Sequence, residues 1–269
     1  MRLYDVVHAV GVATDLNHVD TPSAVKGYLP ENDGLQKALN GEEVVLISAG
    51  ISRKPEMTRD DLFKTNAGII ADLAAGIAQF CPKALVGIIT NPVNSTIPIA
   101  AEVLKKHGAF DPKRLFGVTT LDVVRGSKFV ADVLGNISPQ DIKVPVEFNS
   151  AGMGGDEIVK AKAGAVSATT CMAYAGFRFA QAIIKASQGQ SGVVQPAYVY
   201  LPGLQGGEAV AHELGVGYFA VPVIFGPNSA EIAHPIVSLS TYEEDFLKVA
   251  IDELRGNIKK GEGFIQAQA

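Results

Sequence analysis

The chain has 269 residues and a formal net charge of -5, with 47% hydrophobic and 19% charged residues. This is the composition of a globular protein with a substantial core, and the length fits two modest domains. The mildly acidic balance, without a long cluster of lysine and arginine, argues against nucleic acid and membranes as partners. Two distant cysteines favour a reducing intracellular compartment, mitochondrial or cytoplasmic, between which the sequence does not choose.

Short apolar runs that end in Gly, Asn or Thr alternate with helical stretches in the first part of the chain. We predict buried parallel strands at residues 3–7, 43–49, 84–90 and 114–118. Helices are predicted between them, at residues 58–79 and 95–107. This alternation is typical of a Rossmann-like α/β fold, in which helices cover both faces of a parallel sheet.

The pattern changes after about residue 119, and we place a domain boundary near Val118. The predicted elements of the second part are a helix at 121–134, a strand at 143–146, a helix at 167–186, strands at 193–201 and 218–225, and a final helix at 242–260. The sequence therefore predicts an α/β domain at 1–118 followed by an α+β domain at 119–269.

Two arginines, Arg53 and Arg59, flank a Lys-Pro turn between an apolar strand and a helix, and Arg125 follows on a later helix. The guanidinium group presents a planar fork of donors that matches a carboxylate. Arginines at the carboxyl end of a buried strand therefore indicate a site that captures a small organic acid.

Three further polar residues stand at strand ends or helix starts, and each has a structural alternative. Asn91 can hydrogen-bond a substrate or a cofactor, or it can simply form an Asn-Pro turn before a helix. Asp122 shares a helix face with Arg125, as part of a site or as a surface ion pair. Asp5 can accept hydrogen bonds from a cofactor ribose, or it can cap a helix or a turn.

Four ordered motifs resemble those of NAD-dependent malate dehydrogenases, in the mitochondrial and bacterial branch of the lactate/malate dehydrogenase family. They are Arg-Lys-Pro-x-Met-Thr-Arg-Asp-Asp-Leu-Phe from Arg53, Asn-Pro-Val-Asn-Ser-Thr from Asn91, Phe-Gly-Val-Thr-Thr-Leu-Asp-Val-Val-Arg from Phe116, and Ala-Lys-Ala-Gly-x-x-Ser-Ala-Thr from Ala161. The resemblance is collinear over almost the whole chain. It implies oxidation of malate to oxaloacetate, NAD as the cofactor, and a homodimer.

The resemblance also implies roles for single residues. Arg53 would pair with the distal carboxylate of the substrate and Arg125 with the carboxylate next to the reacting carbon. Arg59, on a loop that closes over the substrate, would polarise the carbonyl, and Asn91 would hydrogen-bond the substrate. Asp122 would orient the catalytic histidine of the family.

Six residues would serve the cofactor under the same resemblance. The ribose would be bound by Asp5, Asn66 would contact NAD, and Met172 would pack near the nicotinamide. The strand end Ile89, Thr90 and Asn91 would line the nicotinamide site.

The sequence departs from the family in two places. The first strand and its glycine-rich turn would precede Met1, and we expect that strand between those at 3–7 and 84–90. After Val146, the segment that carries the catalytic histidine is absent, and residues 147–153 lead directly to the next helix. We therefore expect impaired turnover, because a general base contributes on the order of 10²–10⁴-fold.

Two alternative functions stay open. The chain could be a non-catalytic family member that dimerises or binds dicarboxylates, because residues 10–18 and 125–134 resemble helices that pair subunits in this family. A lactate or other 2-hydroxy acid dehydrogenase is less favoured, because Arg53 supplies a cation for a second carboxylate.

Overall fold

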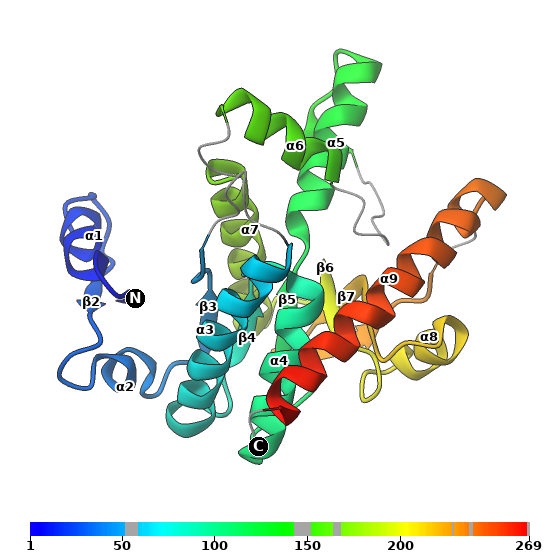
Figure 1. The fold of residues 1–269 in the computed structure, drawn as a ribbon. Coiled ribbons are helices and arrows are strands. Elements are labelled where there is room, and N and C mark those ends of the chain that lie inside the picture. The colour runs from blue at the N-terminus through cyan, green and yellow to red at the C-terminus, as the bar shows by residue number, and fades with distance from the viewer. Residues whose placement is uncertain (52–58, 143–151, 164–167, 228, 237–238, 268–269) are drawn as a thin grey trace.

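The computed structural model describes the chain except for residues 52–58, 143–151, 164–167, 228, 237–238 and 268–269. The described residues form an α/β fold with two sheets (Figure 1). The strands are β1 Arg2–Tyr4, β2 Lys26–Tyr28, β3 Val44–Ile47, β4 Leu85–Ile88, β5 Leu115–Val118, β6 Val193–Tyr200, β7 Tyr218–Phe225 and β8 Ala230–Ala233. A six-stranded sheet has the order β3-β4-β5-β6-β7-β8, and β1 pairs with β2 in a second sheet.

Helices connect these strands and cover the larger sheet. They are α1 Ala9–Leu16, α2 Gly34–Leu39, α3 Arg59–Phe80, α4 Val93–Lys106, α5 Thr120–Leu134, α6 Gly152–Ala161, α7 Thr170–Ser187, α8 Gly207–Leu214 and α9 Thr241–Gln266, with a 3-10 turn at Pro139–Asp141. The predicted α/β class is confirmed: β3, β4 and β5 are parallel, and α3 and α4 connect them.

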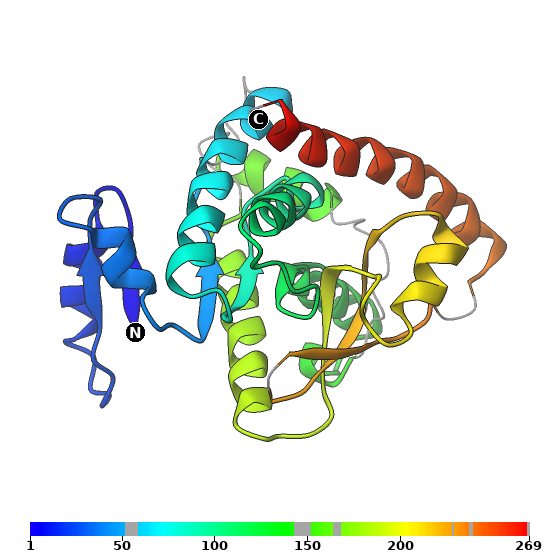
Figure 2. The ribbon, with the colours of Figure 1, turned by 90° about the horizontal axis from the view of Figure 1, so that it is seen from below.

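Helix α4 covers one face of the parallel strands and α7 covers the other. A Cβ atom added to Gly117 in β5 would lie 2.7 Å from Val93 and 3.2 Å from Ile97, both in α4. A Cβ atom added to Gly87 in β4 would instead lie 3.3 Å from Phe179 in α7. Helices α3 and α9 pack beside α4, which completes that layer (Figure 2). Burial on both faces explains why these strands are uninterrupted apolar runs.

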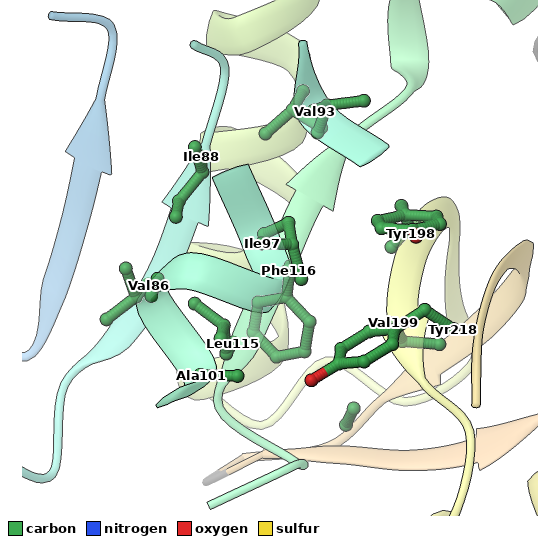
Figure 3. Packing of buried hydrophobic residues seen from close by; sticks show 14 of the residues in the cluster. Val86, Ile88, Val93, Ile97, Ala101, Leu115, Phe116, Tyr198, Val199 and Tyr218 are labelled. Carbon is green, nitrogen blue, oxygen red and sulfur yellow. The ribbon is translucent and has the colours of Figure 1, made fainter. Parts of the chain in front are cut away.

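The core lies where β4 and β5 meet α4 and the antiparallel strands (Figure 3). Phe116, Phe179 and Phe225 form edge-on ring pairs with centroids 5.1–6.3 Å apart, a favourable geometry for aromatic pairs. Strands β6 and β7 pair over eight positions, from Val193 with Phe225 to Tyr200 with Tyr218. Strand β5 also pairs with β6, so one sheet contains strands from both sides of residue 118. The domain boundary near residue 118 stays a prediction.

The C-terminal helix α9 returns to the early helices. The hydroxyl of Ser95 in α4 donates to the carbonyl of Asn257, 3.0 Å away. A Cβ atom at Gly261 would overlap the carbonyl oxygen of Ser95, so the two helices approach too closely for a larger residue there. The ring of Phe264 lies 5.8 Å from that of Phe63 in α3. The end of the chain is thus part of the helix layer over the sheet.

The open edge of the larger sheet differs from the prediction. We expected the family's first strand beside the strand at 84–90, but β4 has β3 on one side and β5 on the other. Within the described residues, β3 pairs only with β4 and is the edge strand. The expectation was wrong because an apolar run identifies a buried strand without indicating its neighbours. Strands β1 and β2 form a separate parallel pair, which α2 links to α3.

Most predicted elements are confirmed within a few residues, including every predicted helix and the strands at β3 to β7. The strand predicted at 3–7 ends at Tyr4, because the carboxylate of Asp5 accepts the N–H groups of Val7 and His8 and turns the chain towards α1. The strand predicted at 143–146 lies outside the described residues.

Candidate active site

The carboxyl ends of β3, β4 and β5 meet at one edge of the sheet, because these three strands are parallel. The residues that follow them are Ala49 to Ile51, Thr90 with Asn91, and Thr119 with Thr120. Helices α3 and α5 begin at this same end of the sheet (Figure 1). Ligands of open α/β sheets bind outside the carboxyl ends of strands, so this edge is the candidate site.

The side chain of Asn66 joins two of these strand ends from α3. Its Oδ1 accepts the N–H of Ile51 at 2.9 Å, and its Nδ2 donates to the carbonyl of Asn91 at 2.7 Å and to that of Ile51 at 3.4 Å. Asn66 is only 1% exposed. Its removal would leave three partly buried main-chain hydrogen bonds unmade. Water can reach these groups, so each loss costs about 0.5–1.5 kcal/mol. The predicted contact of Asn66 with the cofactor stays a prediction.

Thr90 makes the second connection between the same strand ends. Its buried hydroxyl donates to the carbonyl of Ala49 at 2.5 Å, and its own carbonyl accepts the hydroxyl of Thr96 at 2.9 Å. Gly50 lies between the two side chains with φ +125, and a Cβ atom there would lie 2.8 Å from Oδ1 of Asn66 and 2.9 Å from Thr90. Only glycine fits this backbone conformation and this spacing.

Asn91 is exposed at the end of β4. Its carbonyl is held by Asn66, and its Oδ1 accepts the N–H of Val93 at 3.4 Å, at the start of α4. The turn-forming alternative is therefore present in the structure. The predicted contact of Asn91 with a substrate stays a prediction.

Asp122 and Arg125 lie in the first two turns of α5, both half-buried. Burial raises the pKa of the Asp122 carboxyl to about 6, and the positive charge of Arg125 opposes that rise. Burial has the larger effect because the carboxylate loses water that one guanidinium does not replace. Asp122 is consequently a carboxyl with a raised pKa, in the first turn of the helix that follows β5. Its predicted catalytic role stays a prediction.

Ile89 and Met172 supply an apolar side to this edge. A Cβ atom at Gly176 in α7 would lie 2.9 Å from Cδ1 of Ile89. Met172 lies one turn earlier on α7, is half-buried, and packs against the core. Residues four apart share a helix face, so Met172 and Ile89 lie on the same side of the edge.

Two buried hydroxyls at the end of β5 were not predicted from the sequence. Those of Thr119 and Thr120 find no hydrogen-bond partner among the residues that the structure describes. A buried polar group normally has a partner, so unsatisfied groups at a strand end suit a bound ligand. Only the buried position of a Thr-Thr pair directly after a strand could have indicated them.

The structure does not bring Asp5 to this edge. Asp5 is exposed beside the separate β1-β2 pair, where its carboxylate accepts the N–H of Val7 at 2.8 Å and that of His8 at 3.2 Å. These two hydrogen bonds lower its pKa. The turn-forming alternative is again present, and the ribose contact stays a prediction.

The three predicted arginines are described unequally. Arg53 lies outside the described residues. Arg59 begins α3, but its side chain is not described. Arg125 is described, with its charge acting on Asp122. The predicted convergence of the three guanidinium groups therefore stays a prediction.

Comparison with known proteins gives the same family over both parts of the chain. Residues 1–117 match the NAD binding domain of lactate/malate dehydrogenases, and residues 147–265 match their alpha/beta C-terminal domain. The mitochondrial malate dehydrogenase of Saccharomyces cerevisiae is 43% identical, over 100% of this chain and 86% of its own length. The chain belongs to the lactate/malate dehydrogenase family. The human mitochondrial enzyme is 44% identical, over 99% of this chain and 84% of its own length.

Relatives within the family include a glyoxysomal malate dehydrogenase of Cucumis sativus, 45% identical over 99% of this chain and 80% of its own length. The alignment with the yeast enzyme spans 297 positions, 28 more than the 269 residues of this chain. At least that many positions of this relative have no counterpart within the chain. The alignment length does not place these positions, and the internal segment expected after Val146 stays a prediction.

Solved structures show the same fold. The malate dehydrogenase of Picrophilus torridus superposes with a TM-score of 0.81 at 22% identity, covering 100% of this chain and 91% of that one. That of Cryptosporidium parvum gives 0.79 at 24% identity, covering 97% and 90%. Among the described residues, no helix is long and apolar enough to cross a membrane, and no cluster of metal-binding side chains is present.

Proposed function

We propose that the chain binds NAD together with malate or oxaloacetate, as a malate dehydrogenase. The observation that carries this proposal is the edge formed by β3, β4 and β5, where Asn91, Asp122 and Arg125 stand on neighbouring strand ends and on the helix that follows. Identity of 43–45% to malate dehydrogenases over essentially the whole chain supports this substrate.

The substrate roles follow from charge. Malate carries two carboxylates, and arginine is the side chain that pairs with a carboxylate through two parallel hydrogen bonds. We assign the carboxylate next to the reacting carbon to Arg125, the distal carboxylate to Arg53, and the reacting oxygen to Arg59 and Asn91. An arginine without its carboxylate in a closed pocket is costly, so Arg53 disfavours substrates with a single carboxylate.

The residues at the edge fit the nicotinamide end of NAD. Ile89 and Met172 give an apolar wall for the ring, and the unsatisfied hydroxyls of Thr119 and Thr120 suit a carboxamide, which both donates and accepts. NAD, when bound, accepts the hydride. We also propose Thr90 and Asn66 for this region and Asp5 for the ribose, as the family resemblance implies.

Oxidation of an alcohol releases a proton, and the chain must hold it. The family resemblance implies a segment with a catalytic histidine after Val146, and this sequence lacks it. We therefore propose that Asp122 has no histidine to orient. The five histidines present are His8, His18, His107, His212 and His234. His107 follows the C-terminal end of α4, and its Nδ1 lies 2.8 Å from the carbonyl of Val103. We therefore expect turnover about 10²–10⁴-fold below that of complete relatives.

Two measurements test this function separately. Oxaloacetate-dependent oxidation of NADH by the purified chain should be at most about 1% of that of a complete relative assayed in parallel. Calorimetric titration of (S)-malate into the chain with NADH should still show binding. Full activity would contradict the expected impairment. Absence of binding by malate and by NADH would contradict the proposed function.

We also propose a homodimer, because two described helices leave apolar side chains in water. On α5, Val133 is 86% exposed and Leu134 is 64% exposed, and Phe129 lies one turn before Val133. On α1, Val10 and Val12 are also exposed. Several exposed apolar side chains on one helix, as on α5, mark an interface. Light scattering should give the mass of a dimer, and Val133→Glu should give a monomer. A wild-type monomer at micromolar concentration would refute the dimer.

The remaining proposals concern organisation. We propose an NAD domain at 1–118 and a substrate domain at 119–269, supported by the separate family matches at 1–117 and 147–265. We propose an intracellular location, supported by the mitochondrial and glyoxysomal names of the relatives. The compartment, mitochondrial or cytoplasmic, stays a prediction. A fusion to a fluorescent protein at the C-terminus would locate it.

A further inference from the structure

Asn66 and Thr90 form a polar connection between two strand ends, which we name the strand-end latch. Asn66 holds both main-chain groups of Ile51, the N–H at 2.9 Å and the carbonyl at 3.4 Å, and also holds the carbonyl of Asn91 at 2.7 Å. Thr90, which precedes Asn91, holds the carbonyl of Ala49 at 2.5 Å. The same two side chains therefore fix the chain on both sides of Gly50.

The latch joins the two segments that carry proposed substrate groups. Ile51 lies two residues before Arg53, and Asn91 is itself a proposed substrate ligand. Asn66 also lies on α3, two turns after Arg59, where that helix begins. Asn66 is 1% exposed. From α3, the helix that begins with Arg59, its buried amide thus connects Ile51, near Arg53, with Asn91.

We infer that Asn66 is a positioning residue for the dicarboxylate site, acting through the backbone of Ile51 and Asn91. This inference rests on the proposed function, and it gives Asn66 a role beyond the contact with NAD that the resemblance implies. Among the residues that the structure describes, the Asn66 amide makes three hydrogen bonds, and all three go to main-chain groups. Small displacements of binding groups weaken recognition strongly, so the latch governs affinity for the diacid.

Malate and NADH are a suitable ligand pair for the test, because both are in the reduced form and do not react with each other. Asn66→Ala should raise the Kd of malate, measured by calorimetry with NADH saturating each variant, on the order of tenfold, which equals about 1.4 kcal/mol. Thr90→Val should raise it in the same direction, whereas Thr90→Ser keeps the hydroxyl and should stay within about twofold.

Asn17 is the matched control, because its amide makes the same type of bridge at a distant place. It accepts the N–H of Val25 at 2.9 Å and donates to the carbonyl of Val25 at 2.8 Å, beside the β1-β2 pair. Asn17→Ala should leave the Kd of malate unchanged. Urea unfolding of every variant shows the folded fraction, so that affinities are compared between folded proteins.

The outcomes separate the two proposals. If the wild-type chain binds no malate, the proposed function fails. If it binds malate, and folded Asn66→Ala binds it equally well, the positioning role of Asn66 is overturned. If Asn66→Ala does not fold, the comparison of Thr90→Val with Thr90→Ser decides, and equal Kd values for those two variants would overturn the role of the latch.

Discussion

Replacing Asp122 by asparagine tests whether burial governs this carboxylate. Asp122 lies in the first turn of α5, and burial raises its pKa from 3.8 to about 6, against the opposing charge of Arg125. The folded state then binds this proton more tightly than the unfolded state does. The stability of the protein should therefore fall as the pH rises from about 4 to about 6, and this loss should stay constant at higher pH.

The size of the effect follows from the same shift. A rise of about two pKa units corresponds to about 3 kcal/mol at full weight. The side chain is only half-buried, so screening by solvent reduces this to about 2 kcal/mol. Asparagine also loses the favourable interaction of a carboxylate with the N-terminus of α5, about 0.3–1 kcal/mol. At about pH 7, Asp122→Asn should therefore raise the free energy of unfolding by about 1–2 kcal/mol.

The assay is urea unfolding of both proteins across this pH range, followed by circular dichroism. The gain from Asp122→Asn should shrink at about pH 4 and disappear at still lower pH, where the wild-type carboxyl is protonated in both states. Asp132→Asn is the control on the same helix, because Asp132 is exposed and forms a surface ion pair with Lys128. It should change stability little at any pH. Parallel stability curves for wild type and Asp122→Asn would refute the argument.

Four further substitutions test the packing and the specificity. Gly261→Ala should destabilise the protein by about 1–3 kcal/mol, because the added methyl overlaps Ser95. Gly256→Ala in the same helix has open space and should stabilise the protein by about 0.5–1 kcal/mol. Thermal unfolding distinguishes the two variants. Phe116→Ala should cost about 3–5 kcal/mol in urea unfolding, because the ring contacts two others in the core. Arg53→Gln, in a chain restored with the family's missing segments, should shift preference from oxaloacetate towards pyruvate in NADH oxidation.

The sequence was sufficient for elements whose local pattern is strong. The runs at β6 and β7 are rich in Val, Tyr and Phe and were predicted with nearly the observed bounds. Strand β2, with the sequence Lys-Gly-Tyr, was missed because it has no apolar run, and β8 is only four residues long. Short strands of this kind are defined by their partner, which a single segment does not specify.

The candidate site shows the same division. The positions of Asn91, Asp122 and Arg125 at strand ends and at a helix start were predicted, because motifs and turn residues identify such places. The burial of Asp122 and the partners of Asn66 were not predicted. Both depend on which atoms surround a side chain after the helices pack on the sheet, and no local pattern in the sequence describes that.

The return of α9 to α3 and α4 has a consequence for biosynthesis. The hydroxyl of Ser95 and the ring of Phe63 have their partners, Asn257 and Phe264, in α9, which is synthesised much later. Gly261 in the same helix allows its close approach to Ser95. The layer over β3, β4 and β5 is therefore completed only after α9 has left the ribosome, although its strands are made early. Nascent chains stalled before residue 241 should be cleaved readily by protease within α3 and α4, and protection there in the absence of α9 would refute this order of events.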